Sequence, residues 1–312
     1  MKLLNEILGT RYPIIQGGMA NIATGKFAAA CSNGGALGVI ACGGMKDGEA
    51  LRKEIKECRA LTNQPFGVNI MLMHPLADEF ARVVVEEKVP VVTTGAGNPG
   101  KYLPAWKEAG IIVIPVVGAP LLAIHLARGG VDAVIAEGTE SGGHVGEMAT
   151  MALVPQVVDA VEIPVIAAGG IADGRQMAAA MALGACGVQV GTCLLASEEC
   201  PIHENYKAAL LKAKGSDTVV TGRTVGAPVR ILKNRMSREY LHLEKEGADK
   251  MELEKFTLGS LRRAVFDGDT QTGSLMAGQV CGMLSEVRPV AEILDDLWQS
   301  GIERMKALGD LC

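Results

Sequence analysis

The sequence contains few aromatic residues and no hydrophobic run long enough to cross a membrane. Phe, Tyr and Trp make up 4% of its 312 residues, and the longest apolar run, 111–124, is interrupted by Pro115, Gly118 and Pro120. A membrane helix needs about 20 consecutive apolar residues, so we expect no membrane segment. At the N-terminus Glu6 and Gly9 come before any apolar stretch typical of a secretory signal can form, which predicts a cytoplasmic protein.

Patterns of metal ligands, disulfides and nucleic-acid-binding surfaces are also missing. The eight cysteines show no Cys-x-x-Cys pair and no Cys/His spacing of a zinc site. A net charge of -5 with few aromatic residues provides no basic surface for nucleic acid. We therefore expect reduced cysteines, no metal site and no nucleic-acid partner.

Short runs rich in Val, Ile and Ala alternate with segments of helical period from Tyr12 to Gly191. None of the runs is polar at alternate positions, which is typical of parallel strands buried on both faces. The predicted strands are Pro13–Gln16, Leu37–Ala41, Phe66–Ile70, Val91–Thr94, Ile112–Val116, Ala133–Ala136, Val165–Ala168 and Gly187–Val190.

Helical segments separate these strands and complete a repeating β/α pattern. They are Gly25–Ser32, Asp47–Leu61, Leu76–Glu87, Pro99–Ala109, Pro120–Arg128, Thr150–Val161 and Asp173–Leu183. The repeat predicts an α/β fold, a closed (β/α)8 TIM barrel. An open doubly wound sheet is the alternative.

The regular pattern stops after Gly191, and the chain becomes charged from Cys200 to Lys255. We interpret this part as a mostly helical subdomain, residues 200–262, inserted after strand eight as a possible lid. The alternative is a solvated appendage without a catalytic part. Residues 1–199 and 263–312 are then the barrel, ending in a helix from about Pro289 to Leu308.

The most informative stretch is 137–146, where His144 lies in a glycine-rich loop after the sixth predicted strand. Active sites of (β/α)8 barrels lie at the carboxyl ends of the strands. Glycines there allow positive φ angles and close approach of a flat ligand, and an unperturbed histidine pKa suits proton transfer. His144 is therefore the candidate catalytic residue, whereas the other four histidines lie in a helix, a loop or the insertion.

Glycines after strands seven and eight predict a phosphate site. Gly169 and Gly170 follow strand seven, and Gly191 and Thr192 follow strand eight, where barrels commonly bind phosphate through backbone N–H groups. The pattern Gly95-x-Gly97-x-x-Gly100 resembles a dinucleotide fingerprint but lacks the acidic residue about 20 positions later, which argues against a Rossmann domain. These features are compatible with isomerases, lyases and flavin enzymes alike.

At these motifs the chain resembles the FMN-dependent enoyl-acyl carrier protein reductases of the FabK type, within the nitronate monooxygenase (2-nitropropane dioxygenase-like) family of flavin barrels. The matching stretches cover nearly the whole chain: 12–20, 65–72, 91–99, 133–146, 163–174, 188–192 and 276–279. The run 167–174 is also similar to inosine monophosphate dehydrogenase, but that family needs a cysteine where this chain has His144.

The resemblance implies that FMN lies across the barrel rim and that His144 is catalytic. The implied FMN-binding residues are Gly18, Met19, Asn69, Glu137, Ser141, Gly142, Gly143, Ala168, Gly169, Gly170, Gln189, Gly191, Thr192, Met276 and Gln279. NADH or NADPH would reduce the flavin, which would then pass hydride to C3 of a trans-2-enoyl thioester. His144 would protonate C2 or stabilise the enolate.

The resemblance also implies a role in bacterial fatty acid elongation, a homodimer and, for some relatives, a monovalent cation. Arg223, Arg230, Lys233 and Arg235 of the insertion are candidates for contact with the acyl carrier protein. The alternatives are a nitronate monooxygenase, which oxidises alkyl nitronates with O2, and a phosphate-ligand barrel without redox function.

Overall fold

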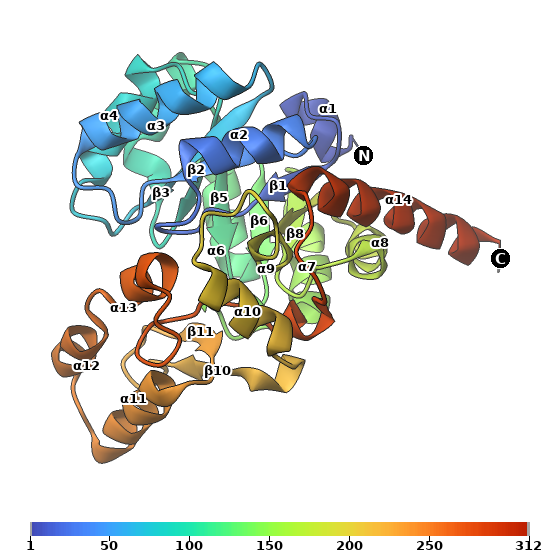
Figure 1. Cartoon of the computed structure of the whole chain (residues 1–312). Helices are drawn as coiled ribbons and strands as arrows, with labels where there is room; N and C mark the ends of the chain where they lie inside the picture. Colours follow the sequence, from blue (N-terminus) through green and yellow to red (C-terminus); the bar gives the residue numbers. More distant parts are fainter. Residues whose placement is uncertain (1, 311–312) are drawn as a thin grey trace.

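Eight parallel strands form a barrel in the computed structural model, which describes residues 2–310 (Figure 1). The strands are β1 Ile14–Gln16, β2 Gly38–Ala41, β3 Phe66–Met71, β4 Val91–Gly95, β5 Ile112–Val117, β6 Val134–Glu137, β8 Val165–Ala168 and β9 Gly187–Val190. Their order is β1-β9-β8-β6-β5-β4-β3-β2, and a parallel bridge between Ile15 and Leu37 joins the two ends. The predicted (β/α)8 fold is confirmed, and the open sheet is excluded.

Aliphatic side chains fill the barrel interior, as the two-sided burial of the strands predicts. Ile15, Leu37, Ile114 and Ile166 are each fully buried in one cluster there. Leu4 of α1 (Leu4–Leu8), a helix that the sequence pattern does not predict, belongs to the same cluster. The barrel is therefore a packed core, and ligands have room only at its rim.

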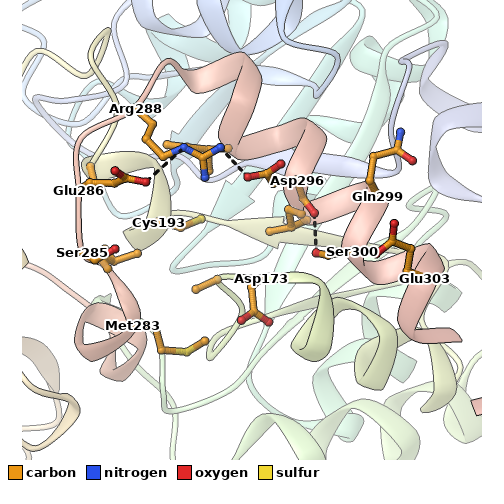
Figure 2. A pocket seen from close by; sticks show the side chains of 15 residues that line it. Asp173, Cys193, Met283, Ser285, Glu286, Arg288, Asp296, Gln299, Ser300 and Glu303 are labelled. Atoms are coloured by element: carbon orange, nitrogen blue, oxygen red, sulfur yellow. Dashed lines mark hydrogen bonds and ion pairs between the residues drawn. The ribbon is translucent and has the colours of Figure 1, made fainter. Parts of the chain in front are cut away.

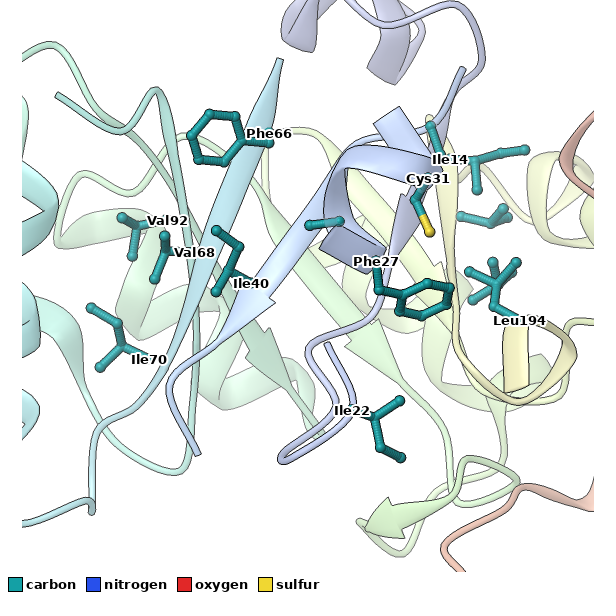
Figure 3. Close-up of a cluster of buried hydrophobic side chains, with 14 of the residues drawn as sticks. Ile14, Ile22, Phe27, Cys31, Ile40, Phe66, Val68, Ile70, Val92 and Leu194 are labelled. Carbon is teal, nitrogen blue, oxygen red and sulfur yellow. The ribbon is translucent and has the colours of Figure 1, made fainter. Parts of the chain in front are cut away.

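A ring of helices surrounds the strands: α2 Gly25–Asn33, α3 Gly48–Leu61, α4 Ala77–Glu86, α5 Leu103–Glu108, α6 Pro120–Arg128, α7 Thr150–Ala160 and α8 Gly174–Ala182. Phe27, Ile40 and Val68 belong to the apolar layer between helices and barrel (Figure 3). The helix predicted at Pro99–Ala109 is instead split into a 3-10 turn, Pro99–Lys101, and α5. Pro104 lacks the N–H that a continuous helix would need at this point.

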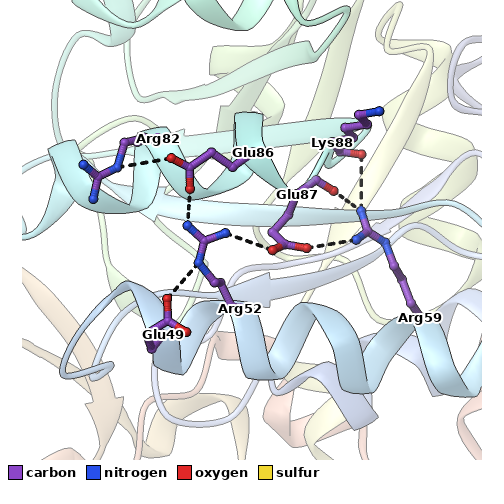
Figure 4. A network of polar contacts seen from close by, with 7 residues as sticks. All are labelled: Glu49, Arg52, Arg59, Arg82, Glu86, Glu87 and Lys88. Carbon is purple, nitrogen blue, oxygen red and sulfur yellow. Dashed lines mark hydrogen bonds and ion pairs between the residues drawn. The ribbon is translucent and has the colours of Figure 1, made fainter.

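An ion-pair network joins the outer faces of α3 and α4 (Figure 4). Arg52 contacts Glu49 and Glu87 at 2.9 Å each and also pairs with Glu86, while Arg59 lies 3.2 Å from Glu87. Exposed pairs usually contribute about 0–1 kcal/mol each. This network stabilises the packing of α3 against α4 on the outside of the barrel.

The segment after β9 and the short helix α9 (Thr192–Leu195) contains helices and a β-hairpin. Its elements are α10 Glu204–Lys212, η2 Gly215–Asp217, β10 Thr218–Thr221, β11 Val229–Leu232, α11 Arg235–Glu246, α12 Lys250–Thr257, α13 Ser260–Arg262 and η3 Arg263–Asp267. A separate small core includes Ile231, Met236, Tyr240 and Leu253. Most of this segment is helical as predicted. The sequence does not predict the hairpin, because its strands are too short to show a clear period.

The chain then returns to the barrel through η4 (Gln279–Met283) and α14 (Val290–Gly309). α14 packs against α8 and α2 and so supplies the helix that follows the eighth strand. A Cβ on Gly174 would lie 2.1 Å from the nitrogen of Gly301, so the two helices cross at glycine. Within residues 2–310, no helix is long and apolar enough to cross a membrane.

Candidate active site

A cavity of about 550 Å³ opens at the carboxyl ends of the barrel strands. It is lined by His144 and by every residue of the predicted FMN site except Gln279: Gly18, Met19, Asn69, Glu137, Ser141, Gly142, Gly143, Ala168, Gly169, Gly170, Gln189, Gly191, Thr192 and Met276. These residues lie on or just after five barrel strands, β1, β3, β6, β8 and β9, and in the returning segment. The fold therefore brings together residues that are more than 250 positions apart in the chain, such as Gly18 and Met276.

Glycine is required where the first loop meets the third strand. A Cβ on Gly18 would lie 2.4 Å from Cγ of Asn69, closer than side chains pack. The Asn69 amide donates from Nδ2 to the Thr93 hydroxyl at 3.0 Å, which fixes its orientation at the cavity wall. Asn69, held by the buried Thr93, thus places a fixed polar side chain in the cavity wall beside the bare backbone of Gly18.

Gly169 and Gly170, directly after β8, line another part of the cavity with bare backbone. Their φ angles are +89° and +72°, a left-handed conformation that glycine adopts without strain. Within residues 2–310 neither backbone N–H has a hydrogen-bond acceptor. Successive free N–H groups of this kind bind anions.

The segment that returns to the barrel after the insertion forms another wall of the cavity. The Thr192 hydroxyl accepts a hydrogen bond from the Gly278 N–H at 2.9 Å. Gln279, which the sequence places in the FMN site, does not line the cavity; its backbone N–H donates to the Glu140 carbonyl at 2.9 Å. The structure therefore places Gln279 behind the loop that carries His144.

Glu137 and Ser141 supply polar groups in a poorly solvated part of the cavity. Desolvation raises the pKa of Glu137 from 4.5 to about 7, with the nearby Ser141 hydroxyl acting in the opposite direction. The Ser141 hydroxyl is itself buried and forms no hydrogen bond of ordinary geometry within residues 2–310. Both groups can therefore hydrogen-bond to a ligand in the cavity.

His144 lies on β7 (Gly143–His144), a two-residue strand at the cavity mouth. Its side chain is exposed through the mouth, yet the surrounding protein desolvates the ring and lowers its pKa below 6.5. The neutral form of the imidazole is consequently favoured at pH 7 and above. A neutral imidazole still carries one N–H donor and one acceptor nitrogen.

Two residues that sequence reasoning misses hold the loop in place. The Glu140 carboxylate accepts hydrogen bonds from Thr150 at the start of α7, at 3.0 Å from N and 2.9 Å from Oγ1. Arg230 of β11 donates from Nε to the Thr139 carbonyl at 3.0 Å. The position of Glu140 could have been recognised, because carboxylates favour helix N-termini. In contrast, nothing local in the sequence connects residue 230 with residue 139.

A second cavity of about 410 Å³ lies between α8, α9 and α14 (Figure 2). None of the predicted site residues lines it. Arg288 crosses it and pairs with Asp296 at 2.5 Å and Glu286 at 3.8 Å. Arg288 is thus already paired, and because no predicted site residue lines this second cavity, the rim cavity remains the candidate active site.

Comparisons with known proteins show similarity over nearly the whole chain. The family model described as nitronate monooxygenase matches residues 1–83 and 78–300. A relative from Rhodococcus jostii is 32% identical over 99% of this chain and 98% of its own length, and is named (3aS,4S,5R,7aS)-5-hydroxy-7a-methyl-1-oxo-octahydro-1H-indene-4-carboxyl-CoA dehydrogenase.

Two solved structures share the whole architecture. FabK from Thermotoga maritima is 49% identical, with a TM-score of 0.97 and full coverage of both chains. The nitroalkane oxidase from Streptomyces ansochromogenes is 31% identical, with a TM-score of 0.87 and coverage of 98% of this chain and 99% of its own. By its sequence and by its fold, the chain belongs to the nitronate monooxygenase family.

Proposed function

We propose that the protein is an FMN-dependent reductase of trans-2-enoyl thioesters that uses NADH or NADPH. The observation that carries this proposal is the position of His144 at the mouth of a glycine-lined cavity. The chain shares the fold of FabK from Thermotoga maritima and 49% of its sequence. The Rhodococcus relative supports a thioester substrate, because its name describes a CoA thioester.

The cavity residues fit FMN in three places. The free N–H groups of Gly169 and Gly170 suit the phosphate. The close contact between Gly18 and Asn69 leaves a smooth surface for a planar ring. The unpartnered Ser141 hydroxyl and the Glu137 carboxyl offer polar groups to the edge of the ring or to the ribityl chain.

Bound FMN would accept hydride from the nicotinamide and donate it to the enoyl thioester. The residues of the chain bind and orient these reactants. His144 stands where the thioester carbonyl would approach from the mouth of the cavity. Because its pKa is lowered, its N–H acts as a hydrogen-bond donor to the oxygen on which negative charge develops. The proton at C2 then comes from solvent. Donation of a proton by His144 itself is the alternative, and pH dependence separates the two.

The surface of the insertion would receive the carrier protein. Arg223, Lys233 and Arg235 are exposed, with Arg223 paired to Glu147 and Lys233 donating to the Ser216 carbonyl at 2.6 Å, whereas Arg230 is only 7% exposed and is removed from this set. Neutralising the three exposed charges should raise the KM for carrier-linked substrate and leave that for a CoA thioester unchanged. The homodimer and the monovalent cation stay predictions.

Nitronate oxidation is the second candidate function. The family description and the nitroalkane oxidase, 31% identical, favour it. The two reactions use the flavin in opposite directions, because a nitronate reduces it and an enoyl thioester reoxidises it.

Stopped-flow mixing tests both candidates. The purified protein is reduced anaerobically with NADH or NADPH and then mixed with crotonyl-CoA, while flavin absorbance is followed. We expect bleaching and then recovery. If the thioester leaves the flavin reduced, while propyl-2-nitronate bleaches the oxidised protein, the oxidase function replaces the reductase function. A purified protein without flavin absorbance, and without uptake of added FMN, rejects both.

A further inference from the structure

Arg230 is a buried cation whose hydrogen bonds go to neutral acceptors. Its side chain, 7% exposed, donates from Nε to the Thr139 carbonyl and from one terminal nitrogen to the Thr218 hydroxyl, each at 3.0 Å. Burial lowers the pKa of Arg230, since the cation loses solvation, and attraction to Glu140 only partly offsets this effect. A buried charge with neutral partners costs free energy that an apolar side chain would avoid, so its position calls for an explanation.

The two acceptors belong to different parts of the molecule. Thr218 lies on β10, the hairpin partner of β11, so this contact remains inside the insertion. Thr139 lies in the barrel loop between β6 and β7. The contact with Thr218 alone would be enough to hold the hairpin together. The contact with Thr139 ties the insertion to the loop that carries His144.

The backbone of the same residue holds the other end of this loop. Arg230 pairs with Gly143 and Val229 with His144 in an antiparallel ladder, and the Val145 N–H donates to the Pro228 carbonyl at 3.1 Å. The segment between the two anchor points contains Gly142 and Gly143, the latter at a φ of +78°. A loop with adjacent glycines is conformationally free unless both ends are fixed.

We propose that Arg230 is a positioning residue that sets the place of His144 by clamping the loop 139–144 at both ends. The inference rests on the proposed function, because His144 receives its role there. Loss of the guanidinium removes the hydrogen bond to the Thr139 carbonyl. The β11–β7 pairing, the Thr139 N–H bond to the Met148 carbonyl at 2.8 Å and the contacts of Glu140 remain, so the loop stays attached but is less restrained. The step that uses His144 slows, and the flavin reduction step, which does not use it, continues.

The test compares the two half-reactions in Arg230→Met, Arg230→Lys and a matched control, Arg263→Met. Arg263 also belongs to the segment after β9 and also donates to backbone carbonyls, those of Leu258 and Thr272 at 3.1 Å, but it does not touch the loop. For Arg230→Met we expect reoxidation by crotonyl-CoA to slow about tenfold or more, with reduction by NADPH within about twofold of wild type. Arg230→Lys, which retains one donor for Thr139, should recover most of the rate. Arg263→Met should match wild type in both steps.

A double variant shows whether Arg230 acts through His144. If it does, Arg230→Met combined with His144→Ala reoxidises no more slowly than His144→Ala alone, because coupled residues are not additive. Additive losses, or equal slowing of both half-reactions in Arg230→Met and Arg230→Lys, overturn the proposal.

Hydrogen exchange separates failure of this proposal from failure of the proposed function. If wild-type protein does not react with enoyl thioesters, the reductase function is wrong, and exchange of the amides in residues 138–146 then decides the clamp. Faster exchange there in Arg230→Met than in Arg263→Met supports the clamp. Unchanged exchange overturns it.

Discussion

Val229 pairs with His144 across an antiparallel ladder, so a strand of the inserted segment holds the candidate catalytic residue from outside the barrel. The two residues are 85 positions apart in the chain. β10, β11 and β7 form a three-stranded sheet of their own, in which β7 is the only strand from the barrel loops within residues 2–310. The insertion is therefore part of the architecture of the active site, whether or not it moves as a lid.

Replacement of His144 by alanine should slow reoxidation by enoyl thioester and leave the cofactor bound. The side chain lies at the mouth of the cavity, whereas the predicted FMN-binding residues are mainly glycines and small polar groups of its lining. Loss of one hydrogen-bond donor to a developing oxyanion costs about 10²–10³ in rate. Stopped-flow absorbance after reduction by NADPH measures this step, with flavin content as the control. A His144→Ala protein with wild-type reoxidation removes His144 from the mechanism.

The pH dependence of reoxidation should be flat from pH 7 to 8.5. The pKa of His144 is lowered below 6.5 by desolvation, so its imidazole is already neutral at pH 7 and its N–H donor is unchanged above that pH. A mechanism that needs the imidazolium would instead slow by about tenfold for each pH unit above the pKa. Single-turnover rates at saturating thioester distinguish the two, and a tenfold fall per unit would show that His144 donates the proton itself.

Gly169→Ala should weaken FMN binding by about tenfold or more, because an L residue at a φ of +89° is strained by about 1–3 kcal/mol. Its Cβ would also lie 2.7 Å from the Gly138 carbonyl oxygen. Gly130→Ala is the matched control, since Gly130 has a φ of +92° and no atom within 4 Å of an added Cβ. Both variants should lose thermal stability, but only Gly169→Ala should lose affinity in a fluorescence titration with FMN. Equal affinities in the two variants would argue against a phosphate site at Gly169.

The sequence predicts the barrel well because each strand is a short, mostly apolar run, and most of these runs end at or just before a glycine. β8 and β9 have the predicted bounds, and the other six barrel strands differ by one residue at one or both ends. The same regularity places His144, Glu137 and Asn69 at one rim, since carboxyl ends of parallel strands lie on the same side. The predicted strand ends are therefore sufficient to show that these loops lie together at the rim.

Long-range contacts made by the insertion could not be predicted in this way. Arg230 resembles other basic residues of a charged segment, and its burial depends on a hairpin whose strands are four residues long. The resemblance to a family places Gln279 in the cofactor site, whereas its backbone supports the loop at Glu140. Periodicity reports burial of regular elements, but it carries no information on which distant loop a side chain meets.

Glu137→Gln should remove a pH dependence of stability in the flavin-free protein. The folded-state pKa of Glu137 is about 7, above its usual 4.5, so the folded protein binds this proton more tightly than the unfolded chain. The resulting stabilisation is fully present below pH 4.5 and is lost as pH rises through 7. Between pH 5 and 8 wild type should therefore lose about 2–3 kcal/mol more of its unfolding free energy than Glu137→Gln does. Urea denaturation at the two pH values measures the difference, and parallel losses in the two proteins would show that Glu137 is ionised throughout.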